Sequence, residues 1–161
     1  MNQFIHKIYT ACFYAYQSDT IKFEMCSTMI SNVMRTHDWS WQVVGITPNA
    51  LEVYKRDHWR HKAGNAIQRA HVTDRKDMIR HIFDREIPMS ESELLDYWIP
   101  ADQTVLATKS ENSNGLPAFW HKFDANGLFR DRGTGFKFTI RDEGEFLKCL
   151  ARSSSELNEQ R

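Results

Sequence analysis

Several features that this chain lacks narrow what it can be. Its 161 residues contain no apolar run long enough to cross a membrane, so we expect no membrane-spanning helix. The N-terminus has no apolar segment followed by a small-residue cleavage site, so we expect no secretory signal. The three cysteines form no C-x-x-C pair, which excludes a zinc finger and a dithiol redox motif. Three separate thiols without an export signal predict a cytoplasmic protein.

The common catalytic signatures are also missing. The sequence has no P-loop, no G-x-G-x-x-G, no G-x-S-x-G and no H-E-x-x-H. These absences argue against a P-loop nucleotide hydrolase, a dinucleotide-binding enzyme, a serine hydrolase of the nucleophile-elbow type and a zinc protease. The turn Gly133-Thr134-Gly135 is too short to be a phosphate-binding loop.

No charge of either sign is in excess, because 21 Lys and Arg balance 21 Asp and Glu. This balance argues against a simple basic coat protein for nucleic acid. The charges are unevenly distributed, however. Residues 55–85 carry nine Lys or Arg and four Asp, a net charge of +5, whereas residues 86–112 carry a net charge of −5. The basic stretch either contacts phosphates or forms a solvated helix surface. Candidate nucleic-acid contacts are Arg60, Lys62, Arg75, Lys76 and Lys109.

The periodicity of apolar residues predicts an α+β fold with more helix than strand. Apolar residues from Ile5 to Tyr16 recur at helical spacing, and Met25, Met29 and Ile30 fall in a second expected helix. Further helices are expected over residues 48–60, 74–85, 91–98 and 143–152, with a short helical turn over 110–113. Thr73 is expected to cap the helix 74–85, Ser90 to cap the helix 91–98, and Pro100 to end that helix. Strands are expected over 39–46, 66–72 and 102–108, with a hairpin around 133–135. We expect one domain over 1–152 and a fraying tail over 153–161.

One group of polar residues has the pattern of a catalytic site. The strand 66–72 carries Gln68-Arg69-Ala70-His71, a long connection leads to the strand that starts at Asp102, and Glu111-Asn112 follows that strand. This order of strand ending in His, second strand, and helix start with Asn resembles the ββα-metal superfamily of nucleases. That superfamily includes the HNH enzymes and the non-specific nucleases with a D-R-G-H motif. The resemblance covers about residues 66–114 and implies a core of two antiparallel strands and a helix.

The resemblance assigns roles to four residues. It implies that His71 is the general base and that Asn112 holds a magnesium or manganese ion. Asp102 stands where HNH proteins carry the middle Asn, and it would orient His71 by accepting an imidazole N–H. Arg69 lies two positions before His71, as the Arg of the D-R-G-H motif does, and would bind a phosphate. The implied activity is hydrolysis of phosphodiester bonds in double-stranded DNA by a restriction-type or phage-type endonuclease.

The chain also departs from the family pattern. Ala70 stands where many HNH enzymes have an acidic metal ligand, and Asn112 follows His71 at a long interval of 41 positions. Two alternatives therefore stay open. One is a non-catalytic module with a nuclease-like fold that binds nucleic acid or protein, and the other is a helical partner-binding protein. Because enzymes that cut palindromic sites are commonly two-fold symmetric, a homodimer is a further expectation.

Overall fold

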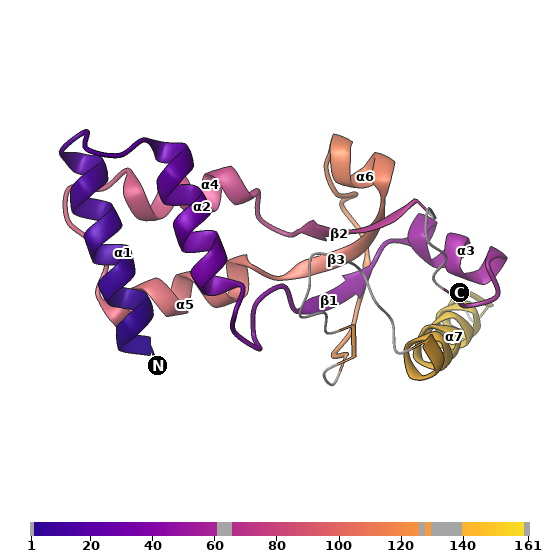
Figure 1. The fold of residues 1–161 in the computed structure, drawn as a ribbon. Coiled ribbons are helices and arrows are strands. Elements are labelled where there is room, and N and C mark those ends of the chain that lie inside the picture. The colour runs from indigo at the N-terminus through magenta and orange to yellow at the C-terminus, as the bar shows by residue number, and fades with distance from the viewer. Residues whose placement is uncertain (1, 61–65, 126–127, 130–139, 160–161) are drawn as a thin grey trace. The chain divides into compact units, whose positions relative to one another are not determined.

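The described residues of the chain form eleven elements of mixed α and β structure, in agreement with the predicted α+β class (Figure 1). The computed structural model describes residues 2–60, 66–125, 128–129 and 140–159. In chain order the elements are α1 (Asn2–Gln17), α2 (Phe23–Met34), β1 (Val43–Ile46), α3 (Pro48–Arg56), β2 (Ile67–His71), α4 (Arg75–Phe83), α5 (Glu91–Ala101), β3 (Thr104–Thr108), α6 (Lys109–Asn114), β4 (His121–Lys122) and α7 (Ile140–Glu159).

The chain divides into two compact units. The first unit comprises residues 1–41 and 71–103, and the second comprises residues 42–70 and 104–161. Each unit is therefore built from two separate stretches of sequence. The sheet strands belong to the second unit, except that His71, the last residue of β2, belongs to the first.

The first unit is helical and consists of α1, α2, α4 and α5. Helix α1 packs against α2 and α5, and α4 packs against α5. Its core is lined by aromatic and aliphatic side chains on the inward faces of these helices, including Ile5, Tyr9, Phe13, Ile30, Met78, Ile82, Phe83 and Trp98. The hydroxyl of the buried Tyr9 donates to the Ile82 carbonyl at 2.8 Å and accepts from the Met89 amide at 3.0 Å. This aromatic residue therefore ties α1 to α4 and to the segment that leads into α5.

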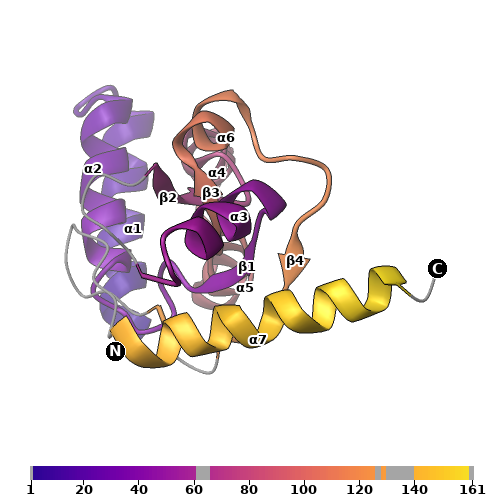
Figure 2. The same cartoon turned by 90° about the vertical axis from the view of Figure 1, so that its right-hand side faces the viewer.

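The second unit is organised around a four-stranded sheet in the order β2-β3-β1-β4. Strand β1 runs parallel to β3 and antiparallel to β4. At the two ends of the β2–β3 pair, Val72 N donates to Gln103 O and Lys109 N donates to Ala66 O, a pattern typical of antiparallel strands. Helix α3 packs against β3, and α7 packs against α3 (Figure 2).

Two element boundaries differ from the sequence prediction because of residues with left-handed backbone angles. The strand predicted from residue 39 begins at Val43, because residues 39–41 form a turn in which Trp41 has φ of 58°. Helix α3 ends at Arg56 rather than near residue 60, because His58 and Trp59 have φ of 54° and 61°. Bulky residues rarely adopt this region, so tertiary contacts must hold it.

Capping and helix ends were predicted with mixed success. Ser90 and Glu93 form the predicted capping box of α5. The cap of α4 is Asp74, whose carboxylate accepts from Lys76 N and Asp77 N, so the assignment of Thr73 was wrong. Pro100 lies inside the last turn of α5, although the sequence prediction placed it after the end of this helix.

The C-terminal part differs as well. Strand β4 was not predicted, and α7 begins at Ile140 and continues beyond residue 152 to Glu159. The hairpin predicted around residues 133–135 lies outside the described residues. Phe129, which precedes this range, has φ of 61° and lies in a turn.

Gly45 in β1 is a point of close packing against the segment of β4. A Cβ atom at this position would lie 2.5 Å from Trp120 Cδ1 and 2.7 Å from the His121 carbonyl oxygen. We expect Gly45→Ala to lower the free energy of unfolding by about 1–3 kcal/mol, the usual cost of overpacking. Urea unfolding measures this loss, with Ser113→Ala on the exposed surface of α6 as the control. An unchanged midpoint for Gly45→Ala would contradict the close packing.

Candidate functional site

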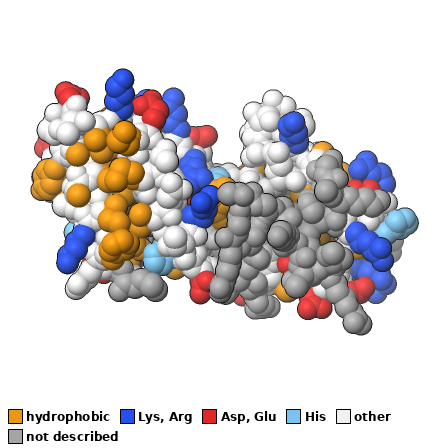
Figure 3. Space-filling view, viewed as in Figure 1, with side chains coloured by type: hydrophobic (Ala, Val, Ile, Leu, Met, Phe, Trp, Pro, Cys, Tyr) orange, Lys and Arg blue, Asp and Glu red, His pale blue; other side chains and the backbone are white. Residues whose placement is uncertain are grey.

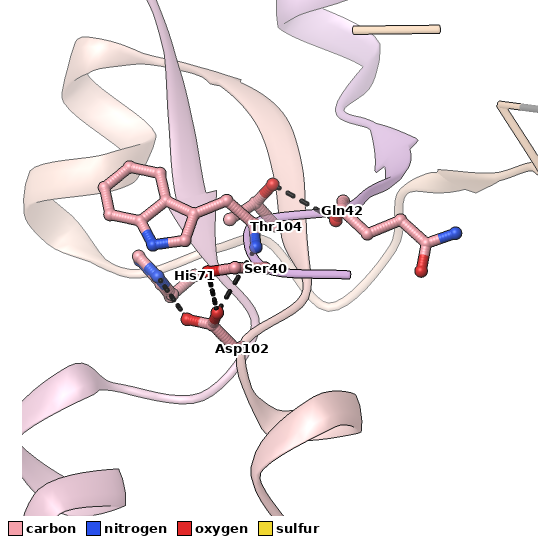
Figure 4. Close-up of polar contacts among 6 residues, drawn as sticks. Ser40, Gln42, His71, Asp102 and Thr104 are labelled. Carbon is pink, nitrogen blue, oxygen red and sulfur yellow. Dashed lines mark hydrogen bonds and ion pairs between the residues drawn. The ribbon is translucent and has the colours of Figure 1, made fainter. Parts of the chain in front are cut away.

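His71 and Asp102 form a buried pair in the first unit. His71 ends β2, and Asp102 caps the C-terminus of α5. His71 Nε2 lies 3.3 Å from Asp102 Oδ1, and the two side chains are 13% and 1% exposed (Figure 4). The structure thus brings together, within one unit, the pair that the resemblance implies.

The second oxygen of the Asp102 carboxylate is held by the loop that precedes β1. Oδ2 accepts a hydrogen bond from Ser40 Oγ at 2.6 Å and one from the Trp41 backbone N–H at 3.3 Å. A buried carboxylate is costly unless its oxygens are satisfied, and these donors satisfy Oδ2, whereas Oδ1 has no hydrogen-bond partner among the described residues. They also fix the orientation of the carboxylate, so that Oδ1 faces His71 (Figure 4).

A tryptophan and an arginine complete the surroundings of His71. The Trp41 ring meets the His71 ring edge-on, with centroids 4.7 Å apart and an interplanar angle of 81°. The guanidinium carbon of Arg75 lies 5.1 Å from the centroid of the same indole ring, within range of a cation–π interaction. Arg75 begins α4, so the contact connects the start of this helix to the histidine through Trp41.

Arg75 is a cation in an unfavourable environment. Burial lowers the pKa of its guanidinium, the Asp102 carboxylate acts in the opposite direction, and the charge of Arg35 lowers it further. Its Nε is buried and makes no hydrogen bond within the described part of the chain. A buried N–H without a partner is rare and costly. A phosphate oxygen would relieve both the missing bond and the repulsion between the two arginines.

The His71–Asp102 pair determines which ring nitrogen is available for chemistry. His71 Nε2 and Asp102 Oδ1 meet at ion-pair distance, and neither atom has a hydrogen-bond partner among the described residues. With the proton on Nε2, Nδ1 holds the free lone pair. The carboxylate also stabilises the imidazolium that forms when Nδ1 takes up a proton. The arrangement is therefore suited to a general base.

Arg69, assigned to a phosphate by the resemblance, belongs to the second unit and contacts other groups there. Its Nη1 donates to the Phe129 carbonyl at 3.5 Å, and its charge acts on Glu143. Glu143 is 1% exposed and accepts from Phe129 N at 2.9 Å. Burial raises the pKa of this carboxyl to about 7, with Asp142 adding to the rise while the Phe129 N–H and Arg69 oppose it.

Asn112, assigned to a metal ion, lies on α6 in the second unit. Its Nδ2 donates to Gln68 Oε1 at 2.8 Å. This bond orients the amide and leaves Oδ1 as a neutral, hard oxygen ligand. A single protein oxygen of this kind suits magnesium, which keeps several water and phosphate ligands. Within the described residues, no three His, Cys, Asp or Glu side chains are grouped so that they could hold an ion.

Glu111, the neighbour of Asn112, has a structural role. Its Oε2 accepts from Thr47 Oγ1, Thr108 N and Thr108 Oγ1 at 2.7–2.9 Å, and its Oε1 accepts from Asn49 Nδ2 at 2.9 Å. Burial would raise the pKa of Glu111, but these four hydrogen bonds together lower it. Thr47 caps α3 and Thr108 caps α6, so Glu111 ties the starts of two helices.

The remaining predicted contacts divide into two groups. Arg60, Lys76 and Lys109 are exposed, while Lys62 lies outside the described residues. Sequence reasoning assigned no role of the kind described above to Ser40, Trp41, Glu111 or Glu143. The spacing Thr108-x-x-Glu111 is that of a capping box and was a usable signal for Glu111. Ser40 and Trp41 gave no such signal.

Comparisons with known proteins yield no match: no protein-family model, curated protein or solved structure is significantly similar to this chain. Among the described residues, no helix is long and apolar enough to span a bilayer.

The raised pKa of Glu143 predicts how stability depends on pH. Its value of about 7 in the folded chain lies above the ordinary 4.5, so the folded state binds the extra proton between these values. We therefore expect stability to fall as the pH rises from about 4.5 through 7, by roughly 3 kcal/mol in total. Glu143→Gln, which imitates the neutral acid, should remove this slope in urea unfolding at pH 5 and pH 8.

The matched control is Glu145→Gln on the same helix, because the Glu145 side chain is 67% exposed. This variant should retain the slope of the wild type. An unchanged slope in Glu143→Gln would show that Glu143 is ionised throughout this range.

Proposed function

We propose that this chain is a metal-dependent endonuclease that hydrolyses DNA phosphodiester bonds with His71 as general base. The observation that carries the proposal is the buried pair of His71 and Asp102, in which the carboxylate is fixed on its other side by Ser40 and Trp41. A histidine oriented by a carboxylate is a standard arrangement for taking a proton from a nucleophile.

The proposed reaction begins with a water molecule next to the His71 ring. Nδ1 accepts a proton from this water while the water oxygen attacks the phosphorus atom. The bond from phosphorus to the leaving 3′ oxygen breaks, and that oxygen departs with the bonding electrons and later acquires a proton from solvent. Asp102 stabilises the imidazolium during this step, because its carboxylate faces Nε2 at 3.3 Å. His71 then returns its proton to solvent.

Arg75 is the residue that we propose for binding the phosphate in place of Arg69. Its guanidinium lies on the Trp41 ring that also contacts His71, and its buried Nε has no hydrogen-bond partner within the described residues. A charged donor held in this way would neutralise part of the charge that develops on the phosphate oxygens.

The metal in this proposal comes from the resemblance to the ββα-metal nucleases, with Asn112 as its ligand through Oδ1. A bound magnesium-class ion would supply charge neutralisation at the phosphate and at the leaving oxygen. The order of β2, antiparallel β3 and α6 agrees with two strands followed by a helix, which supports the relationship. Helices α4 and α5 fill the long interval between His71 and Asn112.

A second candidate function is a non-catalytic binding module. One observation favours it: Asp102 makes its contacts to Ser40, Trp41 and His71 within a single unit, which is also how a purely structural carboxylate would behave. In that case the pair would serve to hold the loop before β1 against the end of α5. Nucleic-acid binding without cleavage would be the outcome that favours this candidate.

Removal of the proposed base distinguishes the two candidates. We expect wild-type protein to nick or linearise plasmid DNA with magnesium or manganese and to leave it intact in EDTA. His71→Ala should lower the cleavage rate by roughly 100- to 10,000-fold, the usual contribution of a general base. It should still shift DNA in a gel. His81→Ala, which removes an exposed histidine from α4, should cleave like the wild type.

Cleavage that survives in His71→Ala would exclude His71 as the base. Intact DNA with wild-type protein, across plasmid and mixed phage substrates and both metals, combined with a gel shift that His71→Ala leaves unchanged, would support the binding module.

Arg75 can be tested against a second arginine of the same helix. Arg75→Gln should weaken DNA binding and slow cleavage by about tenfold or more, because a buried charged hydrogen bond to phosphate contributes roughly 1.5–3 kcal/mol. Arg80→Gln should change neither, since Arg80 is exposed and pairs with Asp84 at 3.6 Å. Cleavage rates and fluorescence anisotropy on a labelled duplex measure both effects. Equal behaviour of the two variants would remove Arg75 from the site.

A further inference from the structure

Helices α1 and α2 expose a surface of apolar side chains that the core does not use. Phe4, Tyr14, Met25 and Met29 are 63%, 59%, 55% and 43% exposed. Together with the exposed Ala11 they form what we term the α1–α2 face. Figure 3 shows hydrophobic side chains gathered over these two helices. Large apolar side chains clustered in this way usually mark an interaction site.

The core of the first unit does not account for these residues, because its buried side chains come from a different side of each helix. In α1 the buried positions include Ile5, Tyr9 and Cys12, and in α2 they are Cys26, Ile30 and Met34. Met25 and Met29 are one turn apart and lie about 100° away from Cys26 and Ile30 around the helix. Each helix is therefore apolar on two sides, and only one side is covered within the unit.

The same helices contain few charges. Across Asn2–Gln17 and Phe23–Met34, Lys7 and Glu24 are the only Lys, Arg, Asp or Glu residues, although 26% of the whole chain is charged. At that average, 28 helical residues would carry about seven charges. Depletion of charge with enrichment in methionine and aromatic residues is the composition of a protein–protein interface core.

We propose that the α1–α2 face binds the same face of a second copy of this chain and forms a two-fold symmetric dimer. A two-fold interface brings one surface against itself, so the surface must be complementary to itself. A face with one positive and one negative side chain meets this condition, since Lys7 of each copy can approach Glu24 of the other. Two helical hairpins packed face to face then form a four-helix arrangement.

The dimensions of the face agree with a weak dimer. Helices of 16 and 12 residues are about 24 and 18 Å long at 1.5 Å per residue. Side by side, two helices present a width of roughly 20 Å, so each copy contributes about 400–500 Å². The total of about 800–1,000 Å² lies at the lower limit for specific interfaces, the size class of weak or transient association.

The scarcity of basic residues favours a second copy of the chain over a membrane surface or a nucleic acid as the partner of the α1–α2 face. A helix that lies on a membrane surface normally carries several Lys or Arg on its polar side, and a nucleic-acid surface needs them as well. The two helices offer Lys7 alone. A second copy of the chain fits because its face is equally poor in charge and because Lys7 and Glu24 are opposite in sign. The inference is independent of the proposed nuclease activity, since the α1–α2 face includes none of the residues assigned to catalysis.

Sedimentation velocity of the full chain tests the dimer. We expect the average mass to rise toward twice the monomer mass between about 1 µM and about 1 mM, the range of weak specific association. The double variant Met25→Lys/Met29→Lys should remain monomeric and keep the melting temperature of the wild type, because both side chains are exposed in the single chain. Ile87→Lys is the control, since Ile87 is 70% exposed and lies outside the α1–α2 face.

Three results would overturn the proposal. The first is a wild-type chain that stays monomeric up to about 1 mM, a concentration at which even a weak specific dimer is well populated. The second is a double variant that associates as the wild type does, which would place any dimer contact elsewhere. The third is a monomeric wild-type chain that binds phosphatidylcholine–phosphatidylserine vesicles and loses this binding in the double variant, which would identify the face as membrane-binding.

Discussion

The Asp102 carboxylate is the interaction on which the arrangement around His71 depends. A carboxylate that is 1% exposed would be strongly destabilising without partners, yet here one oxygen faces an imidazole and the other accepts two hydrogen bonds. These contacts join the end of α5, the loop before β1 and the end of β2. The left-handed backbone of Trp41 is held by the same carboxylate, so the position of the indole, and with it that of Arg75, follows from Asp102.

The second unit shows how the number of donors decides the state of a buried acid. Glu111 receives four hydrogen bonds, and its pKa is lowered despite its burial. Glu143 receives one from Phe129 and is left with a buried oxygen that has no hydrogen-bond partner within the described residues, and its pKa is raised. Both residues lie near the beginning of a helix, where backbone N–H groups favour negative charge. Hydrogen-bond saturation, rather than position on a helix, therefore separates an anchoring carboxylate from one that takes up a proton near neutral pH.

The local sequence pattern predicted the helices and strands of this fold better than the contacts that they make with distant residues. The buried side of α1 and the capping box of Ser90 follow from spacing that acts within a few residues. The turn at Trp41 depends on a hydrogen bond to a residue 61 positions away, which no local pattern reveals. Periodicity identified Met25 and Met29 as apolar helix positions but not which apolar side faces inward. The pairing of His71 with Asp102 came from the family resemblance, whereas the role suggested for Arg69 took no account of Phe129 and Glu143.

The division of the chain has a consequence for its synthesis. The polypeptide passes from one unit to the other three times, between residues 41 and 42, 70 and 71, and 103 and 104. Neither unit is a continuous segment, so neither can be completed while the ribosome has made only its first part. The helical hairpin of α1 and α2 is finished at Met34 but meets α5 only when residue 101 has been added. At roughly 5–20 residues per second this delay is about 3–14 s. During that interval the hairpin exposes both its future core and its α1–α2 face, so the nascent chain has a period in which it depends on protection from aggregation.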